Sequence, residues 1–437
     1  MEESCRSISG FASGSRPFAR FRGKKSCPND PTSDFAFRSF RVFRCSPFFF
    51  CLVTPTPIIP PGSVLGILGG GQLGRMFCME ARRMGYRTLV WTGGLEAPAI
   101  VVADEAIDAP FDSAEALEEF VSKAAVATVE FENIPRETLE AVAARIPLHP
   151  SPNAVAICQH REREKAFLKQ HGIPHAPFAV VASAEELAAA MLEIGTPAVL
   201  KTAAFGYDGK GQLKLTGGED PAAVWAAFAT DRAVLESFIP FERELSVMVA
   251  RSADGSVVAY DPAENRHRHH ILDLSIVPAR VSVAVAGEAK VIACRVAEAL
   301  DYRGIMGVEF FHLPDGSLLV NEMAPRPHNS GHHTLDACAT SQFEQQVRVT
   351  CGLPAGSARL LSPVVMLNLL GDMWPDEQAA PDWTPLFEDG SASLHLYGKR
   401  RAIGRRKMGH ANFLGADLDD ALKRAEAIKS GLLKGGR

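Results

Sequence analysis

Asn321-Glu322-Met323-Ala324-Pro325-Arg326-Pro327-His328-Asn329-Ser330-Gly331-His332 is the stretch that decides how this chain is interpreted. It places an amide, a carboxylate, a guanidinium and two imidazoles within twelve residues. This mixture of functional groups is not typical of a loop that only contacts solvent. A β-hairpin is predicted directly before it, because residues 305–313 and 317–320 are apolar runs separated by the turn signal Asp315-Gly316. The stretch therefore predicts a binding or catalytic site at the end of a hairpin strand.

The predicted hairpin brings two carboxylates together. If Asp315 and Gly316 form a two-residue loop, Glu309 pairs directly opposite Glu322. Like charges with Cβ atoms roughly 5 Å apart repel each other unless a cation lies between them. Carboxylate oxygens are the ligands of Mg²⁺ that carries nucleotide phosphates. The sequence therefore predicts a Mg²⁺ site at Glu309 and Glu322, with two glutamates on a solvated face as the alternative.

Composition excludes several classes of protein. The chain has 437 residues, 46% of them hydrophobic and 22% charged, which predicts about three globular domains. A net charge of −5 gives no general electrostatic reason for binding nucleic acid or a membrane. The nine cysteines show neither CxxC nor CxH spacing, so neither a structural zinc site nor a disulfide framework is indicated. Reduced thiols in a cytoplasm are the simplest expectation.

Residues 1–57 differ from the rest of the chain. Up to Val53 the segment is rich in Arg, Ser and Phe, poor in acids and without hydrophobic periodicity, which predicts disorder. Its apolar run, residues 48–53, is far shorter than the roughly 20 residues of a membrane span and has no small-residue cleavage site. Two interpretations stay open: an organelle transit peptide, or a start codon assigned upstream of the true one.

Deleting residues 1–57 should therefore leave the melting temperature and the turnover nearly unchanged. Thermal unfolding and steady-state assays of the truncated and full-length chains check this expectation. A large loss of folded protein would show instead that the segment packs on the core.

Alternating strands and helices begin at Ser63. A strand at 64–68, a glycine turn at 69–74, a helix at 75–85 and a strand at 88–91 predict a βαβ unit. Gly69, Gly71 and Gly74 satisfy G-x-G-x-x-G, which lets amides at a helix N-terminus approach a phosphate. A dinucleotide site also needs an acid at the end of the second strand, where this chain has Trp91-Thr92-Gly93-Gly94. The pattern favours a phosphate-bearing ligand over NAD, and an NAD-dependent dehydrogenase stays as an alternative.

Two further glutamates follow a predicted strand at 125–129. Glu130 and Glu132 would face the ligand crevice, because acids at the carboxyl ends of parallel strands do so in such folds. A helix N-cap cluster ahead of Pro135 is the alternative interpretation.

A second region begins near Ser151. Arg161 and Lys165 share a helix face at i, i+4, a spacing more typical of a solvated surface than of a site. A strand at 198–200 delivers Lys201, and residues 205–212 form a glycine-rich loop that no helix follows. Such a loop can fold over a nucleotide as a lid, or it can be a plain hairpin turn.

These features occur in an order that resembles the ATP-grasp superfamily. From about Ile58 to the C-terminus the chain is similar, within it, to the 5-(carboxyamino)imidazole ribonucleotide synthase family. The motifs that carry the resemblance are Gly69-Gly70-Gly71-Gln72-Leu73-Gly74-Arg75-Met76, Glu130-Phe131-Glu132-Asn133, Gly206-Tyr207-Asp208-Gly209-Lys210-Gly211-Gln212, Glu264-Asn265-Arg266-His267, the run 321–332, Tyr397-Gly398-Lys399 and Arg406-Lys407-Met408-Gly409-His410. Two departures, Ala203-Ala204-Phe205 before the glycine loop and Glu344-Gln345-Gln346 for the usual Glu-x-His, involve no residue expected to carry chemistry.

The resemblance implies an α/β and α+β fold, an ATP-grasp fold preceded by a doubly wound pre-ATP-grasp domain. The implied boundaries are residues 58–150 for the N-terminal α/β domain, 151–355 for the ATP-grasp domain with a lid at about 178–240, and 356–437 for a small C-terminal antiparallel domain that finishes with a basic strand pair.

The resemblance also implies the reaction, a C–N bond-forming ligase step of purine biosynthesis. ATP and Mg²⁺ would activate bicarbonate as carboxyphosphate, and 5-aminoimidazole ribonucleotide would capture it. A cytoplasmic homodimer is implied, without nucleic acid or membrane as partner. A formate-using ribonucleotide transformylase of the same superfamily is the nearest alternative.

The implied site residues fall into four groups. Those expected to act in the chemistry are Arg326, Asp208, Tyr207, His328 and Lys210. Those expected to bind ATP are Arg161, Lys201, Gly206, Tyr207, Asp208, Gly209, Lys210, Gly211, Gln212, Glu236, Ser237, Phe238, Ile239, Glu244, His267, Asn321 and Glu322. Those expected to bind the ribonucleotide are Gln72, Leu73, Glu130, Glu132, Asn329, Lys399 and Arg406, and the metal ligands are Glu309 and Glu322.

Overall fold

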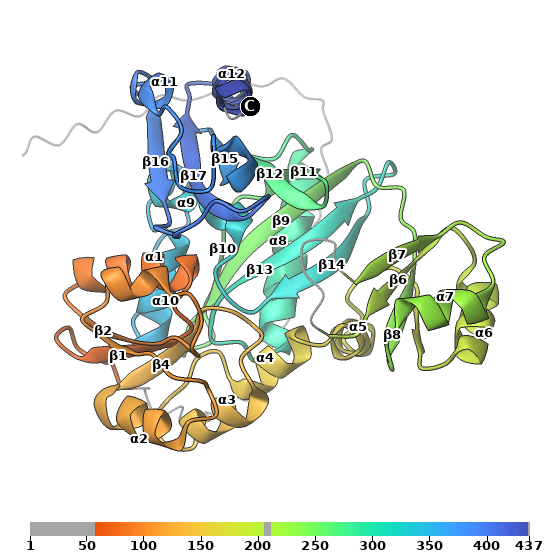
Figure 1. Ribbon diagram of the computed structural model, residues 1–437, viewed down its shortest axis with the longest axis horizontal. Coiled ribbons are helices and arrows are strands. Elements are labelled where there is room, and N and C mark those ends of the chain that lie inside the picture. The colour runs from red at the N-terminus through yellow and green to blue at the C-terminus, as the bar shows by residue number, and fades with distance from the viewer. Residues whose placement is uncertain (1–56, 205–210, 436–437) are drawn as a thin grey trace, which may run out of the picture. The chain divides into compact units, whose positions relative to one another are not determined.

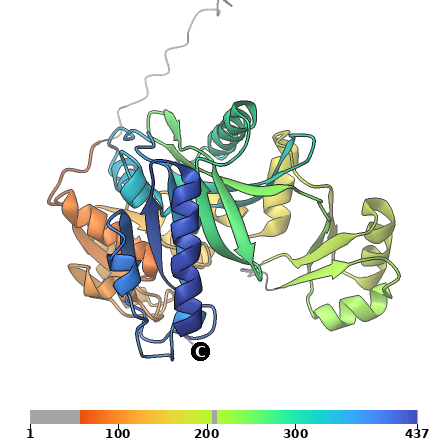
Figure 2. The same cartoon turned by 90° about the horizontal axis from the view of Figure 1, so that it is seen from above.

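A computed structural model describes residues 57–204 and 211–435 of the chain (Figures 1 and 2). The leader and five predicted site residues, Gly206, Tyr207, Asp208, Gly209 and Lys210, lie outside the described residues. Within the described part, every helix is too short or too polar to cross a membrane.

The N-terminal domain is built on a parallel sheet with the strand order β3-β2-β1-β4. Its strands are almost wholly buried because helices cover both faces, which confirms the predicted doubly wound arrangement. Its elements are β1 (Val64–Leu68), α1 (Gln72–Arg83), β2 (Arg87–Trp91), η1 (Pro98–Val101), β3 (Glu105–Ile107), α2 (Ala114–Lys123), β4 (Val126–Val129) and α3 (Arg136–Ala143). Helix α1 begins at Gln72 and not at Arg75 as expected, because the glycine turn ends at its N-cap, Gly71.

A small antiparallel sheet with the strand order β5-β8-β6-β7 occupies the region predicted to be the lid, and it is called the lid below. Helices α6 and α7 lie against it in Figure 1, and the core that they share with the sheet includes Leu187, Leu200 and Leu235. The elements that lead to and form the lid are α4 (Pro152–Cys158), α5 (Arg161–Gln170), β5 (Phe178–Val181), α6 (Ala184–Ile194), β6 (Ala198–Thr202), β7 (Gln212–Leu215), α7 (Pro221–Phe228) and β8 (Ala233–Ser237).

The largest sheet is antiparallel and runs in the order β14-β13-β9-β11-β12-β15-β17-β16, with β10 paired to β9. Its elements are β9 (Arg243–Arg251), β10 (Val257–Ala259), β11 (Ala263–Arg268), β12 (Ile271–Val277), α8 (Val283–Ala299), β13 (Gly304–His312), β14 (Leu318–Ala324), η2 (Asn329–Gly331), α9 (Thr334–Ala337), α10 (Gln342–Thr350), β15 (Val364–Leu370), η3 (Gly371–Met373), α11 (Thr384–Phe387), β16 (Ala392–Leu396), β17 (Lys407–Leu414) and α12 (Leu418–Gly435).

The C-terminal strands extend this sheet, because β15 pairs with β12. The expected basic strand pair is not the end of the chain: β17 is followed by α12, which packs on β15 through Ala421 and Ala425 (Figure 2). Residues 397–406 form the connection between β16 and β17.

The hairpin of β13 and β14 differs from its prediction at the turn. His312 pairs with Leu318, so the loop is one residue longer than the expected two-residue loop, which was wrong. A β-bulge at Asn321 then shifts the register back, since Phe310 pairs with Val320 while Glu309 pairs with Glu322. The two shifts cancel, and the predicted pairing of Glu309 with Glu322 is confirmed.

Candidate functional site

Each of the paired glutamates lies beside a nitrogen-bearing side chain. Glu309 lies 3.2 Å from Nε2 of His328, and Glu322 lies 3.9 Å from the Arg161 guanidinium at the start of α5. Burial, followed by the neighbouring charge of Glu322, raises the pKa of Glu309 to about 7. A carboxylate pair held in this way gains stability when a cation binds between the two groups.

The donor set fits a magnesium ion that also holds nucleotide phosphates. In residues 57–204 and 211–435 there is no cluster of three or more His, Cys, Asp or Glu side chains that could hold a metal alone. Mg²⁺ in nucleotide sites takes one or two carboxylates and completes its shell with phosphates and water. Beside Glu322, Oδ1 of Asn321 is buried without a hydrogen-bond partner, which offers a further hard oxygen.

Two lysines converge on Glu236 at the end of β8. Lys201 on β6 and Lys165 on α5 place Nζ 3.1 and 3.3 Å from the same Glu236 oxygen. Although burial acts to raise it, the charges of Lys165 and Lys201 lower the pKa of Glu236 to about 2. The face of α5 that carries Arg161 and Lys165 was expected to be solvated, and this was wrong, because Lys165 is completely buried.

Two more residues expected at the nucleotide contact each other. Nδ1 of His267 on β11 pairs with the Glu244 carboxylate on β9. Although burial opposes it, this hydrogen bond raises the pKa of His267. The structure thus brings together two side chains that lie 23 residues apart in the sequence.

The connection after β8 brings an aromatic ring and a cation together. Ser237 ends the strand, and Phe238 N–H donates to Pro197 O at 3.0 Å. Nζ of Lys214 lies 3.8 Å from the centre of the Phe238 ring. Ile239 follows, and its carbonyl oxygen accepts a hydrogen bond from Phe241 N at 3.0 Å.

Gly211 and Gln212 join the glycine-rich loop to β7. Gly211 has φ +69°, and a Cβ there would lie 2.5 Å from Oγ1 of Thr202. Gly211 O accepts a hydrogen bond from Thr202 N at 2.9 Å, which fixes this end of the loop to the strand that carries Lys201.

The glycine turn of the N-terminal domain holds a carboxylate of the chain itself. Glu130 accepts hydrogen bonds from the N–H groups of Gly71 at 2.8 Å and Leu73 at 3.3 Å. A Cβ on Gly71 would lie 2.3 Å from the Glu130 carboxylate, so the glycine makes room for this side chain. Burial raises the pKa of Glu130, and the hydrogen bond from Gly71 opposes this. The sequence motif therefore has an explanation besides a ligand phosphate, and the predicted phosphate contact at Gln72 and Leu73 stays a prediction.

Arg326 is oriented by Glu132. The guanidinium contacts the carboxylate through Nε and Nη2, and Nη1 donates to Pro327 O at 3.1 Å. Although burial opposes it, the charge of Glu132 raises the pKa of Arg326. His328 and Asn329 follow on the same loop, where burial and the Arg326 charge lower the pKa of His328 and Nδ2 of Asn329 is buried without a partner.

A small cavity joins residues of the N-terminal domain to residues of the ATP-grasp domain. Its volume is about 30 Å³, enough for a water molecule. Its lining residues are Glu132, Asn133, Cys158, Gln159, Arg161, Glu164, Thr202, Ala203, Ala204 and Glu322. The structure thus brings Glu132, Arg161 and Glu322, which the sequence places far apart, to one point.

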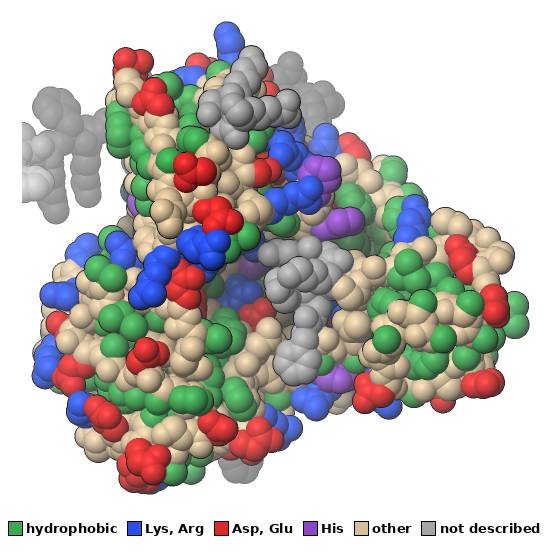
Figure 3. Space-filling model, in the orientation of Figure 1, with side chains coloured by type: hydrophobic (Ala, Val, Ile, Leu, Met, Phe, Trp, Pro, Cys, Tyr) green, Lys and Arg blue, Asp and Glu red, His purple; other side chains and the backbone are tan. Residues whose placement is uncertain are grey.

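Arg406, which was expected to bind the ribonucleotide together with Lys399, contacts an acid that sequence reasoning missed. Arg406 Nη2 lies 2.5 Å from Glu96, which also accepts a hydrogen bond from Arg400 N at 2.9 Å. Lys399 donates to Lys407 O at 2.7 Å, and burial, followed by the Arg406 charge, lowers its pKa to about 8. Figure 3 shows basic and acidic side chains together where the N-terminal domain meets the C-terminal strands.

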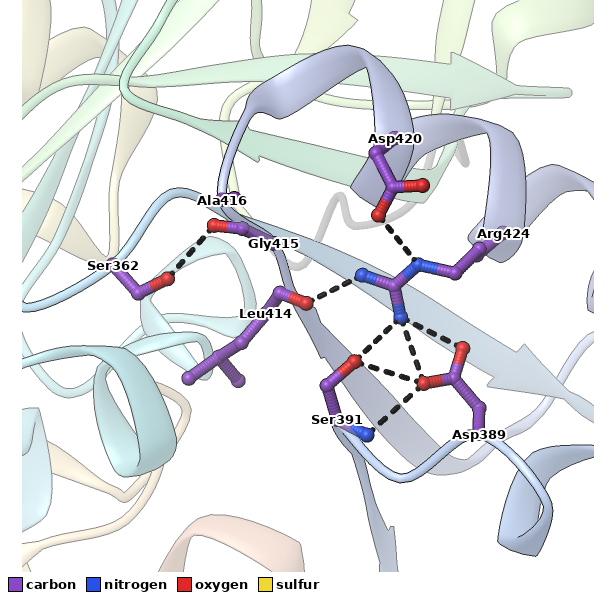
Figure 4. A pocket seen from close by; sticks show the side chains of 8 residues that line it. All are labelled: Ser362, Asp389, Ser391, Leu414, Gly415, Ala416, Asp420 and Arg424. Atoms are coloured by element: carbon purple, nitrogen blue, oxygen red, sulfur yellow. Dashed lines mark hydrogen bonds and ion pairs between the residues drawn. The ribbon is translucent and has the colours of Figure 1, made fainter.

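A larger cavity, of about 420 Å³, lies elsewhere and does not resemble a ligand site. It lies beside α12 in the C-terminal domain (Figure 4). Arg424 at its edge contacts Asp389 at 2.7 Å and Asp420 at 2.9 Å, so its positive charge is already paired within the chain. We interpret it as a groove at the edge of the interface where α12 packs on the sheet.

Three buried or paired residues were absent from the predicted site. Lys165 was discounted because its spacing is typical of a surface, Glu164 was not considered, and Glu96 lies after the strand end where an acid was sought at 91–94. A search extended by two residues could have found Glu96. No local signal distinguishes Glu164 and Lys165, because their partners lie about 160 residues away.

Three families of known domains match the chain in order. They are the ribonucleotide synthetase preATP-grasp domain at residues 63–159, the ATP-grasp domain at 166–343 and the phosphoribosylaminoimidazole carboxylase C-terminal domain at 364–424.

The chain matches curated relatives over nearly the whole of their length. The N5-carboxyaminoimidazole ribonucleotide synthase of Brucella melitensis is 45% identical over 80% of this chain and 96% of its own. That of Bacillus subtilis is 42% identical over 83% of this chain and 94% of its own.

Solved structures agree with these relatives. An ADP complex of an N5-carboxyaminoimidazole ribonucleotide synthetase has a TM-score of 0.80 at 39% identity, covering 86% of this chain and 98% of that one. The Aspergillus clavatus enzyme, solved with ADP and 5-aminoimidazole ribonucleotide, has a TM-score of 0.78 at 30% identity, covering 85% and 99%.

Proposed function

Since the chain belongs to the N5-carboxyaminoimidazole ribonucleotide synthases, ATP-dependent ligases of purine biosynthesis, we propose how its residues carry out that reaction. The reaction converts 5-aminoimidazole ribonucleotide to N5-carboxyaminoimidazole ribonucleotide with ATP. The finer steps and the role of each residue are proposals.

Bicarbonate is the proposed carboxyl donor. Its oxygen attacks the γ-phosphorus of ATP, ADP leaves, and carboxyphosphate forms. The exocyclic amine of the ribonucleotide then attacks the carboxyl carbon, the C–O bond to phosphate breaks, and a proton leaves the nitrogen. The products are a carbamate, ADP and phosphate. Such a path needs positioning and charge neutralisation more than a nucleophilic side chain.

The nucleotide phosphates would lie between the glutamate pair and the basic residues of the lid. Glu309 and Glu322, with Asn321 beside them, would hold Mg²⁺, which neutralises charge on the β- and γ-phosphates when bound. Lys201 and Arg161 would pair with the phosphate oxygens from the other side. The observation that carries the proposal is the pairing of Glu309 with Glu322 at a bulge, with Arg161 3.9 Å away.

The base and ribose of ATP would bind along the end of β8. Backbone groups of 237–239 would contact the adenine edge, together with Oε1 of Glu236, which is buried without a hydrogen-bond partner while the two lysines contact Oε2. The Glu244 and His267 pair would contact the ribose. Gly211 and Gln212 would bring the glycine-rich loop over the phosphates.

Arg326 would stabilise the transferring phosphoryl group and carboxyphosphate. A guanidinium has five N–H donors. Glu132 and Pro327 O take three of them in this structure, which leaves two for the oxygens of an anion. His328 and Asn329 would line the same space, together with Tyr207, Asp208 and Lys210, which stay sequence predictions.

The ribonucleotide phosphate would bind between the N-terminal and C-terminal domains. Lys399 and Arg406 would clamp it opposite the amides at Gln72 and Leu73, near Glu130. The homodimer and the cytoplasmic location likewise stay predictions, and light scattering of the purified chain tests the former.

Phosphate release from ATP tests the proposal against its alternatives. We expect release in bicarbonate that depends on 5-aminoimidazole ribonucleotide. Release with formate but not with bicarbonate would favour a transformylase instead. Saturable binding in a nicotinamide fluorescence titration would favour a dehydrogenase.

A further inference from the structure

Two side chains of helix α5 form hydrogen bonds with the backbone of strand β14, one on each side of Glu322, the proposed metal ligand. Oε1 of Glu164 accepts a hydrogen bond from Met323 N at 2.6 Å. The next residue, Lys165, donates from Nζ to Asn321 O at 2.9 Å. The backbone groups directly before and after Glu322 are thus held by two consecutive side chains of one helix.

These two backbone groups lie on the outer edge of the sheet, which α5 covers. β14 is at the end of the strand order and pairs only with β13 among the described strands. The bulge at Asn321 is what brings Glu322 opposite Glu309. On its outer edge β14 has a single bridge to His175, where Val320 N donates to Pro174 O at 2.8 Å, one residue before the bulge. Beyond this point no strand among the described residues pairs with the bulge from outside, and a slip of one residue would turn Glu322 to the opposite face. Contacts to residues 321 and 323 prevent this slip.

The same lysine connects β14 to the lid. Lys165 is completely buried and shares one Glu236 oxygen with Lys201. In this cluster two lysines face one carboxylate. Lys165 can therefore balance the negative charge of Glu236 when Lys201 pairs with a nucleotide phosphate. A buried ammonium is costly unless it is paired, and an apolar residue would fill this space at lower cost if packing were its only task.

We propose that Glu164 and Lys165 are positioning residues that fix Glu322 in the register needed to hold the metal and nucleotide. This inference rests on the proposed Mg²⁺–ATP site at Glu309 and Glu322. Outer contacts of this kind commonly change metal affinity by about 10- to 100-fold when they are removed.

Binding of Mn²⁺ in the presence of ADP, followed by electron paramagnetic resonance, measures this role without turnover. Lys165→Met should weaken Mn²⁺ binding at least about tenfold. Lys165→Arg should restore most of it, because a guanidinium can reach both oxygens. Lys169→Met, an exposed lysine one turn further along the same helix, is the matched control and should bind as the unaltered chain does.

Glu322→Gln separates this inference from the function on which it rests. Loss of Mn²⁺ binding in Glu322→Gln with normal binding in Lys165→Met would overturn the positioning role alone. Normal binding in both would overturn the metal site and the positioning role together.

A second pair of variants covers the case in which Lys165→Met does not fold. Glu164→Gln keeps an oxygen that can accept from Met323 N and should bind Mn²⁺ nearly normally. Glu164→Leu removes it and should bind at least about tenfold more weakly. Equal binding by these two variants would contradict the proposal.

Discussion

Replacing Glu322 with glutamine is expected to lower ATP turnover at least about a hundredfold, a loss near 3 kcal/mol of transition-state stabilisation. The substitution keeps the shape of the side chain but removes one of two charges at the proposed cation site. It also leaves Arg161, 3.9 Å away, without its acidic neighbour. Steady-state turnover measured over a range of Mg²⁺ concentrations checks this result.

A matched control shows whether the effect belongs to the site. Glu242 precedes β9, and its side chain is 46% exposed, as is that of Glu322. Glu242→Gln should leave turnover nearly unchanged. Near-normal turnover of Glu322→Gln at low Mg²⁺ would show that Glu322 is not a metal ligand.

Arg406→Ala is expected to raise the KM for 5-aminoimidazole ribonucleotide strongly and to leave the KM for ATP little changed. An anion held by a helix N-terminus and two cations should lose about 2 to 4 kcal/mol when one cation is truncated, roughly 30- to 1,000-fold. Because Arg406 pairs with Glu96, truncation also leaves a carboxylate facing the incoming phosphate. Initial rates with each substrate varied in turn measure both constants.

Arg401 provides the control for this prediction. It lies on the same connection but pairs with Glu377 at the surface, where its side chain is 56% exposed. Arg401→Ala should change neither KM. If Arg406→Ala changes neither, or raises only that for ATP, the ribonucleotide phosphate binds elsewhere.

Local pattern was sufficient for much of the fold and for the centre of the site. The alternation of apolar runs and glycine turns predicted β1, α1 and β2 to within a few residues. The Asp-Gly turn predicted the hairpin and the facing glutamates. That pairing was correct although the loop length was wrong, because turn chemistry does not reveal a compensating bulge several residues away.

What pattern could not supply was contact between distant segments. The spacing of Lys165 in the sequence is typical of a surface residue, but β8 and β14 enclose its side chain in the structure. The sequence likewise gives no partner for Glu130, whose carboxylate is bound by the turn at Gly71. The Glu96 pair with Arg406 joins two domains across 310 residues of sequence. Each depends on tertiary packing, which no local periodicity encodes.

The fate of bicarbonate oxygen tests the central claim most directly. The chain should be incubated with ATP, 5-aminoimidazole ribonucleotide and ¹⁸O-labelled bicarbonate, and the released phosphate analysed by mass before the label exchanges with water. If bicarbonate attacks the γ-phosphorus to form carboxyphosphate, each phosphate released carries one oxygen from bicarbonate. Phosphate without label, formed while the carbamate accumulates, would contradict activation of bicarbonate by ATP in this site.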